Sequence, residues 1–174
     1  MAAPALIARL DARDRELFAR LSIFDDGRRR AKRFWTVLTH LGGVSCSVAA
    51  ATLPLGAGGV LGAAAQRASA LLVVSHLAVQ LVKRTVGRPR PSLGVGHQAL
   101  VVEPDRFSFP SGHSAAAMAV AFAYAVAFPH LALVLLPLAL LVGASRVMLG
   151  VHYPGDVLIG QLIALLTGLP ILFG

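Results

Sequence analysis

Long apolar segments separated by short polar stretches dominate the chain from residue 35 onward. The apolar runs cover residues 35–64, 68–82, 113–128, 131–149 and 158–173. A helix needs about 20 residues to cross the hydrocarbon core of a bilayer, so runs of this length predict transmembrane helices. We expect an all-α fold, an integral membrane bundle of five transmembrane helices, with six as the alternative. We interpret 35–64 as one tilted span, the alternative being a break at Pro54.

A different pattern occupies the N-terminal part of the chain. Residues 3–24 place Leu6, Leu10, Leu17 and Leu21 at helical spacing among charged residues, which predicts an amphipathic helix too polar to cross a membrane. We expect it to lie in the membrane interface; the alternative is a helix packed on the end of the bundle. A basic run then precedes Trp35, as is typical of a topology signal. The sequence thus divides into an N-terminal amphipathic basic segment, 1–33, and a transmembrane domain, 34–174.

The composition agrees with a membrane protein and narrows the partners. Hydrophobic residues make up 56% of the chain and charged residues 14%, while the formal net charge is +8. The basic residues lie between apolar runs rather than along one solvated element, so we expect anionic lipid headgroups and not nucleic acid as partners. A single cysteine excludes a disulfide framework and a cysteine-based metal site.

The first candidate cluster follows the second apolar run. Lys83 is followed after six residues by Arg90 and Pro91, at the start of a loop, 86–110, rich in proline and glycine. A guanidinium and an ammonium on a stiffened loop are suited to surround a phosphoryl group. Basic side chains that snorkel from a helix end explain this pair equally well when it is taken alone.

The second cluster is the sequence F-P-S-G-H-S at 109–114, directly before an alanine-rich apolar run. Ser111 is a good N-cap, and Gly112 lets the backbone approach a ligand, so the first amides of the helix can bind an anion beside His113. The alternative is a turn and a cap without a ligand.

The third cluster, S-R-V-M-L-G-V-H-Y-P-G-D at 145–156, joins two apolar runs. Arg146 is costly at a membrane boundary without an anionic partner, and Asp156 is close enough along the chain to orient the imidazole of His152. A structural salt bridge between Arg146 and Asp156 is the alternative.

Together, K-x6-R-P, P-S-G-H and S-R-x5-H-x3-D closely resemble the three signature motifs of the type 2 phosphatidic acid phosphatase (PAP2) family. The resemblance covers residues 83–156, and the apolar runs around them match the membrane-bound branch. The family also includes soluble vanadium haloperoxidases and bacterial acid phosphatases, which the apolar runs argue against.

The resemblance implies a role for each matched residue. His152 would attack phosphorus to form a phosphohistidine, Asp156 would orient it, and His113 would protonate the leaving oxygen and then activate water. The remaining matched residues would hold the non-bridging oxygens: Lys83, Arg90, Ser111, Gly112 and Arg146. Neither a metal ion nor another cofactor is expected, because three cations stabilise the developing charge.

The predicted function is therefore that of a membrane lipid phosphatase. With five spans, fifteen of the sixteen Lys and Arg residues fall on the face that carries the motifs, which favours a cytoplasmic site at the cell membrane. Candidate substrates are phosphatidylglycerol phosphate, phosphatidate and polyprenyl phosphates or diphosphates. The alternative is a non-catalytic anionic-lipid binding or transport protein.

Three further residues carry weaker expectations. Arg88, in a second Arg-Pro pair, lacks the family spacing from Lys83 and is a candidate second headgroup contact. His40 and His76 lie within apolar runs, where we expect buried, hydrogen-bonded histidines rather than functional ones.

Overall fold

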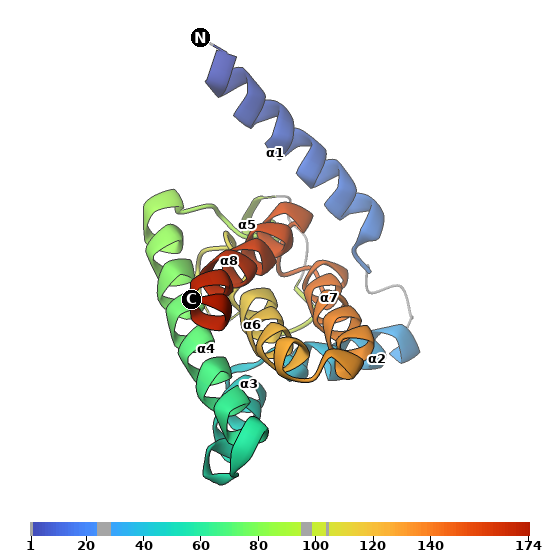
Figure 1. The fold of residues 1–174 in the computed structure, drawn as a ribbon. Coiled ribbons are helices and arrows are strands. Elements are labelled where there is room, and N and C mark those ends of the chain that lie inside the picture. The colour runs from blue at the N-terminus through green and yellow to red at the C-terminus, as the bar shows by residue number, and fades with distance from the viewer. Residues whose placement is uncertain (1, 24–28, 95–98, 104) are drawn as a thin grey trace.

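The computed structural model describes residues 2–23, 29–94, 99–103 and 105–174, and the side chains of 2–10, 93 and 94 lie outside that description. All regular elements in these ranges are helices (Figure 1). In chain order they are α1 (Ala2–Leu21), α2 (Arg29–Leu41), α3 (Val44–Thr52), η1 (Leu53–Gly56), α4 (Gly59–Val86), α5 (Pro91–Gly94), α6 (Gly112–Ala127), η2 (Pro129–Leu131), α7 (Ala132–Met148) and α8 (Pro154–Phe173). The predicted all-α class is confirmed.

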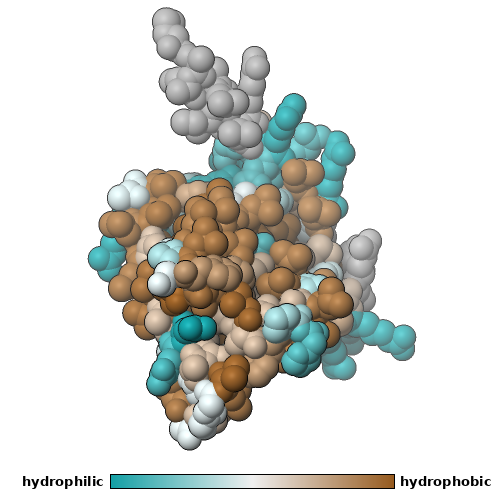
Figure 2. Space-filling view, viewed as in Figure 1, coloured by the Kyte–Doolittle hydropathy of each residue, from teal (hydrophilic) through white to brown (hydrophobic). Residues whose placement is uncertain are grey.

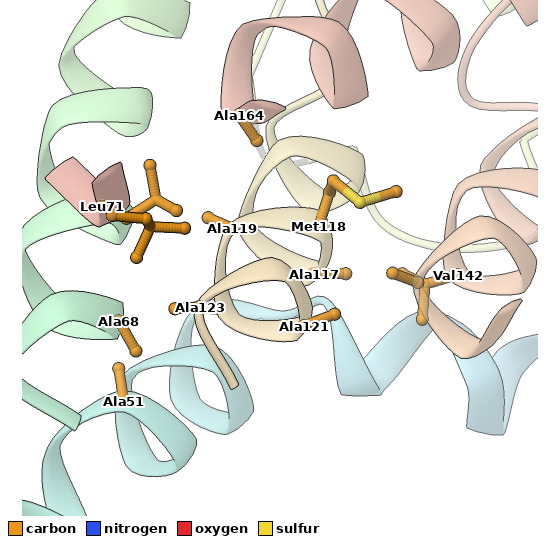
Figure 3. Close-up of a cluster of buried hydrophobic side chains, with 12 residues drawn as sticks. Ala51, Ala68, Leu71, Ala117, Met118, Ala119, Ala121, Ala123, Val142 and Ala164 are labelled. Carbon is orange, nitrogen blue, oxygen red and sulfur yellow. The ribbon is translucent and has the colours of Figure 1, made fainter. Parts of the chain in front are cut away.

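Helix α6 lies at the centre of the bundle, between α4, α7 and α8 (Figure 1). Its buried face is built mainly from alanines, among them Ala117, Ala119 and Ala123. They pack against Leu71 of α4 and Val142 of α7 (Figure 3). Small side chains let neighbouring helices approach closely, which is how helices in membranes commonly associate.

Three helical segments are long and apolar enough to cross a membrane: Gly59–Val86, Pro129–Met148 and Pro154–Phe173. Helices α2 and α3 with η1 form a fourth candidate, bent by 44°. The 16-residue α6 is shorter than the length that a span needs. Length and composition thus support three or four spans among the described residues.

Two predicted boundaries were wrong. The first apolar segment ends at Gly56 rather than at residue 64, and a break at Gly42–Gly43 bends it by 44°. Helix α4 then begins at Gly59 rather than at residue 68, and the exposed Gln66 and Arg67 lie within it. The chain turns at 53–58, where proline and glycine occur, whereas Gln66 and Arg67 belong to the exposed face of α4.

Large apolar side chains cover much of the outer surface (Figure 2). On α8 the exposed Leu158, Leu162, Leu166, Leu169 and Phe173 repeat at intervals of three or four residues, so they lie along one face of the helix. A continuous apolar face of this kind is expected to contact lipid. Hydrophilic residues gather toward the end where α1 lies (Figure 2).

Helix α1 docks on this end of the bundle through Phe18, which is buried and packs with Val147, Tyr153 and Val157. Two of the leucines expected on its apolar face, Leu17 and Leu21, are exposed. The side chains of the other two, Leu6 and Leu10, lie outside the described residues.

Candidate functional site

The three sequence clusters meet at one end of the bundle, formed by the last turn of α4, the first turn of α6 and the connection between α7 and α8. Five of the predicted site residues line a single cavity of about 510 Å³: Lys83, Arg90, Gly112, His113 and His152. Ser111, Arg146 and Asp156 are buried next to these residues.

Asp105, in the loop before α6, binds the two cations of the first cluster. Its carboxylate lies 2.8 Å from Nζ of Lys83 and 3.1 Å from Nη2 of Arg90. Burial alone would raise the pKa of Asp105, but the hydrogen bond and charge of Lys83, with those of Arg90, hold it below its usual value. The sequence did not single out this acid, because nothing in its spacing indicates pairing with a lysine 22 residues away.

Arg90 also reaches the third cluster. Its Nη1 donates to the carbonyl oxygen of Val151 at 2.8 Å and lies 3.3 Å from Nε2 of His152. A guanidinium has no acceptor, so the Nε2 that faces it carries the lone pair and the proton of the neutral ring is on Nδ1. Burial and the nearby Arg146 and Arg90 lower the pKa of His152 to about 4, although Asp156 opposes this effect. At neutral pH the ring is therefore an uncharged potential nucleophile.

Asp156 lies beside the protonated nitrogen of that ring, in the first turn of α8. Its Oδ2 accepts a hydrogen bond from the backbone N–H of Tyr153 at 2.8 Å and lies 3.5 Å from Nδ1 of His152. The distance of 3.5 Å between Oδ2 and Nδ1 is longer than an ordinary hydrogen bond. The interaction between the two side chains is therefore mainly electrostatic. Such a carboxylate can stabilise a positive charge on the imidazole.

Ser111 caps α6 as its sequence predicted. Its hydroxyl accepts from the N–H of Ser114 at 3.5 Å and from the Ser114 hydroxyl at 2.9 Å. Its own N–H donates to the carbonyl oxygen of Asp156 at 2.9 Å, which ties the first turn of α6 to that of α8. Gly160 permits this approach, since a Cβ there would lie 2.5 Å from the Ser111 carbonyl oxygen.

Arg146 is a buried cation with unused donors. Its Nη1 donates to the hydroxyl of Thr39 at 2.6 Å, while Nε and Nη2 have no hydrogen-bond partner among the described residues. No ion pair joins Arg146 to Asp156, so the alternative of a structural salt bridge was wrong. Buried guanidinium donors are rarely left unpaired, and an anion in the cavity would satisfy them.

The two histidines expected to be buried are exposed in the described structure. His76 lines the cavity and lies 3.4 Å from the side-chain nitrogen of Gln80, one turn further along α4. His40 is exposed at the end of α2. Apolar neighbours in sequence indicated burial, but in a membrane helix they equally mark the lipid-facing side.

Within the described residues, no group of three or more His, Cys, Asp and Glu side chains is placed to hold a metal ion. The groups at this end that could bind an anion are Lys83, Arg90, Arg146 and the amides at the start of α6.

Comparisons with known proteins identify the family of the chain. The model of the PAP2 superfamily matches residues 64–172. A decaprenylphosphoryl-5-phosphoribose phosphatase of Mycolicibacterium smegmatis is 41% identical over 133 residues, 71% of this chain and 67% of that protein. A lipid A 1-phosphatase of Rhizobium johnstonii is 38% identical over 100 residues, 51% of this chain and 38% of that protein.

Solved structures show the same fold. LpxE of Aquifex aeolicus has a TM-score of 0.78 at 24% identity, over 90% of this chain and 93% of that one. A transmembrane PAP2-type phosphatidylglycerolphosphate phosphatase of Bacillus subtilis has a TM-score of 0.73 at 25% identity, over 94% and 84%. The chain belongs to the PAP2 superfamily. The predicted family and the predicted class, a membrane lipid phosphatase, are confirmed.

Proposed function

We propose that the chain hydrolyses a terminal phosphomonoester on a lipid headgroup, with a polyprenyl-linked phosphoryl sugar as the first candidate and phosphatidylglycerol phosphate or phosphatidate as the others. The names of the relatives support a lipid phosphate as the substrate. Two of these relatives are named decaprenylphosphoryl-5-phosphoribose phosphatases, which favours a polyprenyl lipid.

The observation that carries this proposal is the composition of the cavity. Its lining includes the imidazoles of His113 and His152 and the cations Lys83 and Arg90. It also includes apolar side chains of α3 and α4: Val44, Val48, Leu72, Val73 and Leu77. A phosphate fits the polar part, and an apolar chain fits the part between the two helices.

The proposed reaction assigns to these side chains the roles that the PAP2 resemblance implies. Nε2 of His152 attacks phosphorus, the bond from phosphorus to the lipid oxygen breaks, and His113 donates a proton to that oxygen. Water then loses a proton to His113 and attacks the phosphohistidine, the P–N bond breaks, and phosphate leaves. Asp156 stabilises the positive charge on the His152 ring.

The cations bind the non-bridging oxygens throughout the reaction. The fork of Arg90 lies beside Nε2 of His152, and Arg146 offers two unpaired donors. Lys83 adds a third positive charge, while the amide of Gly112, behind the Ser111 cap, supplies a backbone donor. Charge stabilisation of this kind is the main source of catalysis in phosphoryl transfer, and it requires no metal ion.

We further propose five spans, counting the bent α2–α3 pair and the central α6, with α1 in the interface and the site on the cytoplasmic face of the cell membrane. The exposed leucines of α1 and the basic residues near the site support this arrangement. Residues 1–33 then form the peripheral segment and 34–174 the transmembrane phosphatase domain.

A substrate panel in detergent with EDTA tests the function. Wild-type protein should release phosphate from at least one lipid phosphate, and His152→Ala should release none. A mutant that retains activity would show that the nucleophile is another residue. Tight binding of lipid phosphate without turnover by the wild type would instead support a binding or transport protein. The presence of His113 and His152 at the cavity disfavours that alternative.

A further inference from the structure

Arg88 is one of the variable positions between Lys83 and Arg90 in the first motif, and it lies at the centre of a network of carboxylates. Its Nη1 donates to Oδ1 of Asp156 and to Oδ2 of Asp14, each at 2.7 Å, and its Nη2 donates to Oδ1 of Asp11 at 2.6 Å. Burial alone would lower the pKa of Arg88, but the charges of Asp156 and Asp14 raise it, so the guanidinium stays charged. One partly buried cation thus joins helix α1 to the carboxylate beside His152.

The two oxygens of Asp156 have different partners. Arg88 binds Oδ1, whereas Oδ2 accepts from the Tyr153 N–H and lies next to Nδ1 of His152. Asp156 is fully buried, so its negative charge needs a cationic partner. Arg88 contacts only Oδ1, which leaves Oδ2 to face the imidazole.

Helix α1 makes further contacts around this carboxylate. Besides binding Arg88, Asp14 accepts from the N–H of Gly155 at 2.7 Å, at the start of α8. A Cβ on Gly155 would lie 2.9 Å from Oδ2 of Asp14, so this contact needs a glycine. The Tyr153 ring packs edge-on against Phe18 of α1, with 5.3 Å between centroids, and beneath the Arg88 guanidinium at 4.1 Å.

We propose that Arg88 is a positioning residue: it orients Asp156 and, through Asp156, His152. Asp11 and Asp14 of α1 hold Arg88 in place for this role. Asp11 and Asp14 engage the fork of Arg88, so that a single nitrogen reaches Asp156. Without them the planar fork can rotate to pair with both oxygens of Asp156, which removes negative charge from the side that faces the imidazole. This role rests on the proposed function, since it concerns the same His152–Asp156 pair.

The variants Arg88→Gln and Asp14→Asn, made in the full chain and purified in detergent, test the role. Matched controls are Arg84→Gln, at an exposed arginine in the last turn of α4, and Glu16→Gln, at an exposed acid on α1 that pairs with Arg20. The measurements are kcat and KM for the lipid phosphate that the panel identifies, inhibition by orthovanadate, and the melting temperature.

We expect kcat to fall about 10- to 100-fold in Arg88→Gln and less in Asp14→Asn, the size usual when a residue that orients a functional histidine is lost. KM and the inhibition constant for vanadate should stay within about two-fold of the controls, because the phosphate-binding cations are untouched. Arg88→Lys should restore part of the lost rate. Since the effect passes through Asp156, Arg88→Gln should add little to the loss already caused by Asp156→Asn.

Three results would overturn the role: kcat values equal to those of the controls, a parallel loss of kcat, vanadate binding and melting temperature, or a full additional loss in the Asp156→Asn background. If Arg88→Gln does not fold, Asp14→Asn gives the same comparison. A wild-type protein that hydrolyses no lipid phosphate would instead contradict the proposed function.

Discussion

Nη1 of Arg90 lies 3.3 Å from Nε2 of His152, so a fixed positive charge faces the nitrogen that would attack phosphorus. This contact disfavours a proton on Nε2, so Nε2 remains the unprotonated nitrogen of the ring at neutral pH. One interaction thus joins the proposed nucleophile to a cation that we propose binds the phosphate.

The pH dependence of the reaction should reflect this environment. The neutral ring is the attacking form, so the rate should fall as the pH falls through the His152 pKa of about 4. Arg146→Gln removes a charge that lowers this pKa and should shift it upward, whereas Asp156→Asn should shift it downward. An NMR titration of histidine-labelled protein measures the shifts, with His152→Gln identifying the resonance; equal pKa values in both variants would contradict the assignment.

The close contact between α6 and α8 predicts a strong effect of a single methyl group. In Gly160→Ala the new Cβ would meet the Ser111 carbonyl oxygen at 2.5 Å, so one helix end must move. We expect a destabilisation of about 1–3 kcal/mol, as for overpacked sites, with a loss of activity. Gly56→Ala, with open space around it, is the control in thermal denaturation and phosphate release; similar behaviour of the two variants would show that the contact is unimportant.

The apolar part of the cavity predicts a selective effect on lipid substrates. Leu77→Trp should fill the space between α3 and α4 and raise KM for a long-chain lipid phosphate about tenfold, equivalent to ~1.4 kcal/mol. KM for a short soluble phosphomonoester should not change. Val74→Trp, at an exposed position of α4 outside the cavity lining, is the control. Equal effects on both substrates would place the lipid chain elsewhere.

The proposed orientation can be tested with single cysteines in a Cys46→Ser background. Val102, 91% exposed in the loop near the site, and Gly58, at the opposite end of α4, are suitable positions. If the site faces the cytoplasm, an impermeant maleimide should label Gly58→Cys but not Val102→Cys in intact cells. The reverse pattern would place the site on the outer face.

The site could be predicted from the sequence where its signals are local. The Ser111 cap, the cations flanking the prolines and the His152–Asp156 spacing each lie within a few residues of one another. The partners that complete the site come from distant segments: Thr39 is 107 positions from Arg146, and Asp14 is 74 from Arg88. No local pattern indicates such pairings, because tertiary packing alone brings them together.

The same limit applied to the fold. Hydropathy predicted the helical membrane class correctly, since apolar run length reflects bilayer thickness. It misplaced the start of α4, because a polar pair such as Gln66–Arg67 has the same hydropathy in a turn as on an exposed helix face.

The hydrogen bond from the N–H of Ser111 to the carbonyl oxygen of Asp156 runs from main chain to main chain. Substitution of either residue by alanine leaves this main-chain hydrogen bond in place. Alanine scanning would therefore underestimate its contribution to the packing of α6 against α8. Ser111→Pro, which removes the donor, or a larger side chain at Gly160 would reveal that contribution.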